Sequence, residues 1–194
     1  DENGLTENTL VVYTSDQGMF LGDHGWHDKR FMYEESLRMP FLARLPGKIE
    51  AGSVASDMLL NVDFAPTFME YAGVDVPGEV QGTSGKDLLE GDTPEDWQNS
   101  AYYRYWMHTI GHKVIPNYGV RTERYKLIYY YGVTLEDTRN PDINIDAEWE
   151  LYDLETDPRE MNNVYGQPEF AEVQADMLTE LDRLQAKAGD EPRH

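Results

Sequence analysis

The sequence predicts an α/β fold in two parts, and three observations support this prediction. Residues 9–13 form a continuous apolar, β-branched run, which indicates a strand buried on both faces, as in a parallel sheet under helices. From residue 100 onward, short runs with a period of two predict antiparallel strands. Residues 168–187 carry an apolar stripe with helical spacing. We therefore expect an α/β part over residues 1–97 and a small antiparallel sheet with a C-terminal helix over residues 98–194.

The first part contains few further regular elements. A second buried strand is predicted over residues 40–45, and the Pro-Gly pair that follows would end it. Asp63 is a plausible N-cap for a helix that ends before Gly73. Residues 75–97 are rich in glycine, proline and acidic side chains, with one helical turn around residues 87–89. This loop is the predicted boundary between the two parts.

The second part reads as four strands and one helix. Strands are predicted over residues 100–107, 118–121, 125–131 and 149–152, with a hairpin turn at residues 122–124. The apolar stripe of the helix consists of Phe170, Val173, Met177, Leu181 and Leu184. A small sheet closed by one helix is the natural packing for these elements.

Composition excludes several kinds of function. The chain has 16 basic and 37 acidic residues, a net charge of -21, which repels phosphate backbones and anionic lipids. We therefore expect neither nucleic acid nor a membrane as a partner. There is no cysteine, which removes disulfides, thiolate zinc sites and cysteine nucleophiles.

Asp16 and Gln17 are candidate metal ligands because they stand where the first predicted strand ends. In open α/β sheets, ligands bind at the carboxyl ends of the strands. A carboxylate and an amide carbonyl are hard oxygen donors, which suit calcium, or less well magnesium, and are poor ligands for zinc. The alternative is that Asp16 only caps the loop.

The loop after Gln17 is unusual in an acidic chain. Its glycines permit close backbone approach, and it concentrates titratable side chains: His24, His27, Asp28, Lys29 and Arg30. A lysine held near a divalent cation is a sensible arrangement for an anion, because both charges stabilise its oxygens. The two histidines are candidates for substrate contact, or for hydrogen bonds within the loop.

Two further candidates lie in the second part. His112 follows Gly111 between the first two predicted strands, on a segment that could overhang a site, and is a better candidate for substrate contact than His108. Arg121 could bind an anion, but a salt bridge to one of the many carboxylates explains it equally well.

Four groups of motifs resemble the sulfatase family, and most closely its bacterial glucosamine-6-sulfatase-like and iduronate-sulfatase-like members. The first group is Asp16-Gln17, Gly22-Asp23-His24-Gly25, Lys29, Tyr33-Glu34-Glu35-Ser36, Arg38 and Pro40. The later groups are Val62-Asp63-Phe64-Ala65-Pro66-Thr67 with Ala72-Gly73, Gly119-Val120-Arg121-Thr122 with Tyr125-Lys126-Leu127-Ile128, and Glu150-Leu151-Tyr152-Asp153-Leu154 with Asp157-Pro158. The resemblance covers nearly the whole chain.

The resemblance implies an alkaline-phosphatase-like α/β domain followed by a small antiparallel subdomain. It implies that Asp16 and Gln17 are calcium ligands and that Lys29 holds a sulfate oxygen. The nucleophile of the family is a formylglycine hydrate, made from the first residue of a Cys/Ser-x-Pro-x-Arg motif, which attacks sulfur. The implied parent enzyme removes sulfate from a sulfated carbohydrate such as a glycosaminoglycan, with 6-O-sulfated glucosamine as our narrow expectation.

The sequence departs from the family in lacking this motif. We therefore expect the C-terminal part of a sulfatase, inactive alone, whose partner is the missing N-terminal half of the same protein. The parent is expected to be periplasmic or secreted. One alternative is a phosphonate or phosphate ester hydrolase of the same superfamily. The other is a non-catalytic module that binds sulfated glycans, against which the acidic composition argues.

Overall fold

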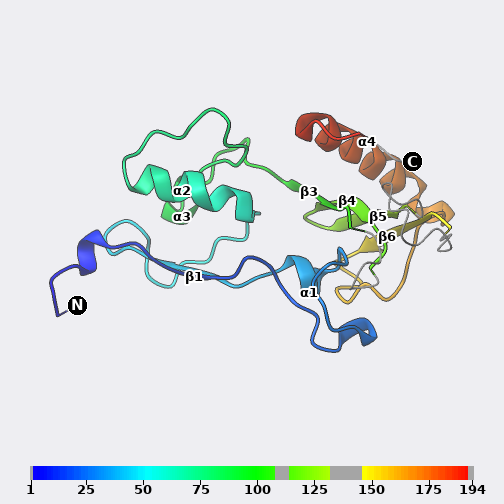
Figure 1. The fold of residues 1–194 in the computed structure, drawn as a ribbon, viewed down its shortest axis with the longest axis horizontal. Helices are drawn as coiled ribbons and strands as arrows, with labels where there is room; N and C mark the ends of the chain where they lie inside the picture. The colour runs from blue at the N-terminus through cyan, green and yellow to red at the C-terminus, as the bar shows by residue number, and fades with distance from the viewer. Residues whose placement is uncertain (1, 108–113, 132–145, 192–194) are drawn as a thin grey trace. The chain divides into compact units, whose positions relative to one another are not determined.

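The computed structural model describes residues 2–107, 114–131 and 146–191 (Figure 1). The chain forms two compact units, one made of Asp1–Gln17 and Arg38–Asn99 and the other of Gly18–Leu37 and Ser100–His194. Residues Gly18–Leu37 thus belong to the same unit as the C-terminal part of the chain, and not to the unit formed by the rest of residues 1–97. Among the described helices, none is both long enough and apolar enough to cross a membrane.

The first unit contains a two-stranded sheet. After a short 3-10 helix, η1 (Thr6–Asn8), strand β1 (Val11–Thr14) pairs antiparallel with β2 (Phe41–Arg44). The expectation that residues 9–13 lie in a parallel sheet, buried on both faces, is wrong, since Tyr13 is 66% exposed. The apolar run predicts a strand, but the direction and coverage of a strand depend on neighbours that its own sequence does not specify.

In its described residues, the first unit contains three further helices and one buried carboxylate, that of Asp63. The helices are η3 (Asn61–Asp63), α2 (Phe64–Tyr71) and α3 (Lys86–Glu90). Asp63 precedes α2 as expected, but its side chain makes no cap hydrogen bond to that helix. It accepts hydrogen bonds from the backbone N–H groups of Leu60 and Thr83, both at 2.9 Å, and from the Gln98 amide at 2.6 Å. Asp63 thus ties three loop segments together.

The second unit is built on a four-stranded antiparallel sheet. Its strands follow the chain order β3 (Ser100–Tyr105), β4 (Asn117–Thr122), β5 (Tyr125–Tyr130) and β6 (Glu148–Asp153). All four predicted strands are confirmed. The predicted hairpin turn joins β4 to β5, where the Thr122 hydroxyl accepts a hydrogen bond from the Tyr125 N–H at 3.0 Å.

One face of this sheet packs against the predicted helix. Residues Pro168–Phe170 form the 3-10 turn η4, and α4 (Ala171–Ala188) continues from it across the sheet (Figure 1). The core of this face consists of Tyr118, Val120, Leu127, Tyr129, Tyr131, Leu151, Met177, Leu181 and Leu184. Side chains alternate along a strand, so the residues between these point to the opposite face.

That opposite face carries the segment Gly18–Leu37, which includes the short helices η2 (Asp23–Gly25) and α1 (Glu34–Leu37) (Figure 1). Met32 is fully buried there in a cluster with Ile128, Tyr130 and Tyr152. Only glycine fits opposite Met32, because a Cβ on Gly119 would lie 2.7 Å from the Met32 Sδ and 2.1 Å from the Leu127 carbonyl oxygen. The sheet is therefore packed on both faces.

Candidate functional site

The predicted metal ligands lie beside a hollow at the end of β1. Asp16 is one of the residues that line this hollow of about 590 Å³, together with Thr14, Ser15, Asn61, Val62 and Phe64. The Asn61 amide donates to the Asp16 carbonyl oxygen at 3.1 Å, and the Ser15 hydroxyl donates to the Asp16 carboxylate at 3.2 Å. Gln17 follows directly and is half-buried.

This arrangement fits part of a calcium site. The Asp16 carboxylate and the Gln17 amide offer hard oxygen atoms, and the carboxylate lies at an exposed concave surface. Calcium takes about six to eight oxygen ligands. Within the described ranges, no three His, Cys, Asp or Glu residues form a group that could hold a metal ion. The chain can therefore supply some ligands of such a site.

We expect this chain alone to bind calcium weakly, with a dissociation constant of about 1 mM or higher, because two donors leave most of the coordination to water. Isothermal titration calorimetry checks this, with Asp16→Ala beside Asp75→Ala, an exposed aspartate outside the hollow, as the matched control. Tight stoichiometric binding that only Asp16→Ala abolishes would contradict it.

Lys29 lies in the segment Gly18–Leu37, and hydrogen bonds hold its backbone on both sides. Its carbonyl oxygen accepts a hydrogen bond from the Ser36 hydroxyl at 2.7 Å, and its N–H donates to the Asp28 carboxylate at 2.5 Å. The carbonyl oxygen of Arg30 accepts from the Tyr103 hydroxyl at 2.9 Å. Burial raises the pKa of Tyr103 to about 12, so this hydroxyl keeps its proton at neutral pH.

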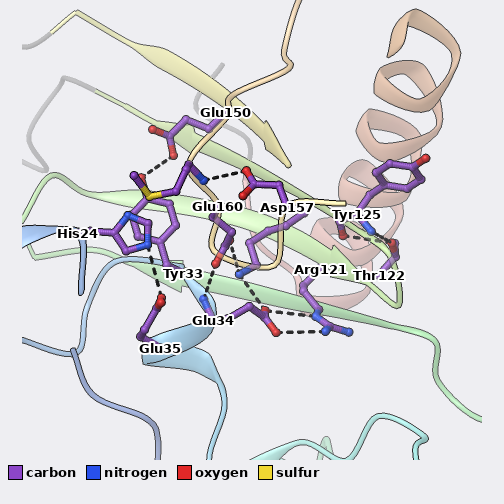
Figure 2. A network of polar contacts seen from close by, with 12 residues as sticks. His24, Tyr33, Glu34, Glu35, Arg121, Thr122, Tyr125, Glu150, Asp157 and Glu160 are labelled. Carbon is purple, nitrogen blue, oxygen red and sulfur yellow. Dashed lines mark hydrogen bonds and ion pairs between the residues drawn. The ribbon is translucent and has the colours of Figure 1, made fainter. Parts of the chain in front are cut away.

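His24 contacts its own segment. Its ring stacks on Tyr33 at 4.6 Å between centroids, and its Nε2 lies 3.6 Å from the Glu35 carboxylate (Figure 2). The side chain is 17% exposed. These contacts support a role within the loop, whereas His27 is exposed. His112 and His108 lie outside the described residues.

Arg121 pairs with a carboxylate, as one of its two interpretations expects. Its guanidinium lies 3.2 Å from the Glu34 carboxylate (Figure 2). The Lys126 ammonium lies 2.9 Å from the same carboxylate and 2.7 Å from that of Glu160. We call these four residues, Glu34, Arg121, Lys126 and Glu160, the Lys126 network.

The charges within this network are strongly coupled. Burial acts to raise the pKa of the Glu34 carboxyl, but Lys126 and Arg121 outweigh burial and hold that pKa below its usual value. Burial raises the pKa of Glu160, although Lys126 opposes this effect. The side chains of Lys126 and Glu160 are both 0% exposed. The network is therefore an internal structure, closed to solvent at its centre.

Lys126 and Glu160 were not among the predicted site residues. One signal was present, because Lys126 is in register with Ile128 and Tyr130 on the same face of β5. A lysine in phase with apolar residues of a strand indicates either an edge or a buried ion pair. The carboxylate partners could not be identified from spacing, since Glu34 and Glu160 are distant in sequence.

The fold and these motifs define the class of protein. Solved structures with this fold include sulfatases, and the expected alkaline-phosphatase-like α/β fold is confirmed. A family model described as N-sulphoglucosamine sulphohydrolase, C-terminal, matches residues 22–187. The chain belongs to this sulfatase family, as its motifs predict.

Individual relatives support the same family membership. N-acetylglucosamine-6-O-sulfatase of Bacteroides thetaiotaomicron is 49% identical over 189 residues, which are 96% of this chain and 32% of the relative. A solved structure of BT4656 in complex with its substrate D-glucosamine-2-N,6-O-disulfate is 48% identical, with a TM-score of 0.85, over 96% of this chain and 36% of that one.

A structure of a different hydrolase also matches. Phosphonate monoester hydrolase from Silicibacter pomeroyi is 25% identical, with a TM-score of 0.75, over 96% of this chain and 36% of that one. The chain thus spans about a third of the length of these relatives.

Proposed function

We propose that this chain is the C-terminal part of a sulfuric ester hydrolase that removes the 6-O-sulfate from glucosamine units of a sulfated carbohydrate. The observation that carries the proposal is 49% identity to an N-acetylglucosamine-6-O-sulfatase over 96% of this chain. A match of that extent takes in the Asp16–Gln17 pair, the Lys29 segment and the Lys126 network.

In this proposal, Lys29 binds a sulfate oxygen and Asp16 and Gln17 are ligands of calcium. The ammonium group supplies a fixed positive charge where negative charge develops as the S–O bond to the alcohol breaks. Bound calcium would polarise the sulfate oxygens as a Lewis acid. The chain contains no cysteine and no Ser-x-Pro-x-Arg motif, so it supplies no formylglycine. It therefore lacks the nucleophile and should be inactive alone.

The full-length enzyme is expected to release inorganic sulfate from D-glucosamine-2-N,6-O-disulfate and to leave the N-sulfate in place. Ion chromatography measures the sulfate, and NMR of the product sugar identifies which position lost it. Glucosamine carrying only the N-sulfate is the control substrate. Release of the N-sulfate with the 6-O-sulfate retained would contradict the proposed specificity.

A phosphonate or phosphate ester hydrolase is the second candidate, which the match to a phosphonate monoester hydrolase favours. A lysine and a divalent cation would stabilise either anion. The ratio of kcat/KM for phenyl sulfate to that for phenyl phenylphosphonate separates the two candidates. A ratio above one supports the sulfatase, and a ratio below one supports the alternative.

A further inference from the structure

We propose that the Lys126 network positions Lys29, and that Lys126 and Glu160 are positioning residues for the binding of the sulfate group. The network fixes helix α1 on the sheet, and α1 in turn holds the backbone of Lys29. This inference rests on the proposed function, because it assigns the network to the anion-binding step of that reaction.

Lys126 is buried together with its carboxylate partners. Its side chain is 0% exposed, and its ammonium has carboxylate oxygens at 2.7 and 2.9 Å. A buried ion pair is weak evidence for stability, since the loss of hydration can exceed the attraction between the charges, and apolar replacements of the whole group are often neutral. Such a network is better explained by the geometry that it imposes.

The Lys126 network fixes both the position and the orientation of α1. The N–H of Glu34, the first residue of the helix, donates to the Glu160 carboxylate at 2.7 Å, and the Glu34 side chain binds Arg121 (Figure 2). The Glu34 carboxylate also lies 2.9 Å from the Lys126 ammonium. Glu160 itself has a left-handed backbone, with φ of 53°. For a residue other than glycine this conformation is strained, and it persists only where its surroundings hold it.

Ser36 links α1 to the backbone of Lys29. Ser36 lies in α1, and its hydroxyl donates to the Lys29 carbonyl oxygen at 2.7 Å. The Ser36 carbonyl oxygen accepts a hydrogen bond from Gly18 at 2.8 Å, so this turn closes the start of the segment as well. A shift of α1 would therefore move the backbone from which the Lys29 side chain extends.

Other contacts keep the segment attached when the network is weakened. Met32 packs on Gly119, the Tyr103 hydroxyl binds the Arg30 carbonyl oxygen, and the Tyr33 hydroxyl donates to Glu150 at 2.9 Å. Loss of the Lys126 charge should thus loosen the α1 end while the segment stays on the sheet. The expected result is a folded protein in which Lys29 is misplaced and catalysis is slower.

Two of the motif groups that carry the family resemblance supply residues of this network, and a third ends two residues before Glu160. Glu34 belongs to Tyr33-Glu34-Glu35-Ser36, Lys126 follows Tyr125, and Glu160 comes two residues after Pro158. None of these residues was assigned to the metal or the sulfate. The inference gives these residues a shared role, which is to position Lys29.

A double-mutant cycle in the full-length enzyme tests the inference, with Lys126→Met, Lys29→Met and both together. With D-glucosamine-2-N,6-O-disulfate, Lys126→Met is expected to lower kcat/KM by about 10- to 100-fold, as for an active-site group displaced by about 1 Å. It should also weaken competitive inhibition by inorganic sulfate. In the Lys29→Met background, Lys126→Met should change kcat/KM by less than about 2-fold, because a residue that acts through Lys29 has nothing left to position.

Arg124→Met is the matched control, because Arg124 is a cation of the same hairpin that pairs with Asp153 and Glu155. It should leave kcat/KM within about 2-fold of the wild-type value. An unchanged kcat/KM in Lys126→Met would overturn the inference. So would an equal loss in both backgrounds, which would indicate a general structural role.

If Lys126→Met fails to fold, or if the wild-type enzyme releases no sulfate, amide hydrogen exchange still tests whether the Lys126 network holds α1 in place. Glu160→Gln preserves the shape of the side chain and removes its charge. An increase in exchange over the wild-type rate that is larger in residues 29–37 than in β3 supports the inference. An unchanged exchange rate in residues 29–37 overturns it. Absence of sulfate release from the wild-type enzyme would contradict the proposed function, but not the inference that the network holds α1.

Discussion

Replacement of Lys29 with alanine is expected to lower kcat of the full-length enzyme on D-glucosamine-2-N,6-O-disulfate by about 10²–10³-fold. Removal of one preorganised charge from a transferring group has an effect of this size. The structure supports it, since hydrogen bonds to Ser36 and Asp28 fix the backbone of Lys29. A fixed charge needs no reorganisation when the S–O bond breaks.

Steady-state kinetics measures this effect, and Lys187→Ala provides the control. Lys187 is an exposed lysine in the last turn of α4, in the same compact unit, so its loss changes the net charge equally. A Lys29→Ala enzyme with wild-type kcat and KM would remove Lys29 from the site.

The Lys126→Met variant is expected to lose about 3–5 kcal/mol of unfolding free energy at neutral pH, the usual result when one partner of a buried ion pair is removed. Without Lys126, the buried Glu160 carboxylate would lose the ammonium that lies 2.7 Å away, whereas Glu34 would keep Arg121 at 3.2 Å. Urea denaturation followed by circular dichroism measures the loss, and the exposed Arg124→Met serves as a control with a much smaller effect.

The same variant should recover part of its stability in acid. Burial already raises the pKa of Glu160 in the native protein, and removal of Lys126 takes away the charge that opposes this shift. A carboxyl whose pKa is raised on folding favours the folded state below its unfolded pKa, and this contribution is lost as pH rises through the folded pKa. The stability deficit should therefore shrink as the pH falls from 7 toward about 4.5. A deficit independent of pH would show that the buried carboxylates are not its cause.

The small sheet could be predicted from sequence because its signals are local. Period-two alternation defines β3 to β6, and the helical stripe from Phe170 to Leu184 defines the face of α4 that packs on the sheet. The strands at residues 9–13 and 40–45 carry local signals too, but their antiparallel pairing does not. The apolar run is equally compatible with a central strand and with the antiparallel, partly exposed pair that β1 and β2 form.

The candidate site residues were predicted from their chemistry, and the contacts that support them could not be predicted. Asp16 and Lys29 attract notice because carboxylates at the end of a strand, and lysines in glycine-rich loops, suit metals and anions. Arg121 remained open between an anion and a carboxylate, and only the fold brings Glu34 to within 3.2 Å of it. Glu160 could not be recognised, because its backbone hydrogen bond to Glu34 spans a sequence separation of 126 residues.

That separation has a consequence for the order in which the molecule is completed. A ribosome makes residues 18–37 well before Glu160, which accepts the Glu34 N–H across a separation of 126 residues. Until then the segment that bears Lys29 lacks the sheet face on which it packs, and long loops close more slowly than short ones. Its native arrangement is therefore reached only after Glu160 has been translated. A nascent chain that stops short of Glu160 cannot hold Lys29 as the finished protein does.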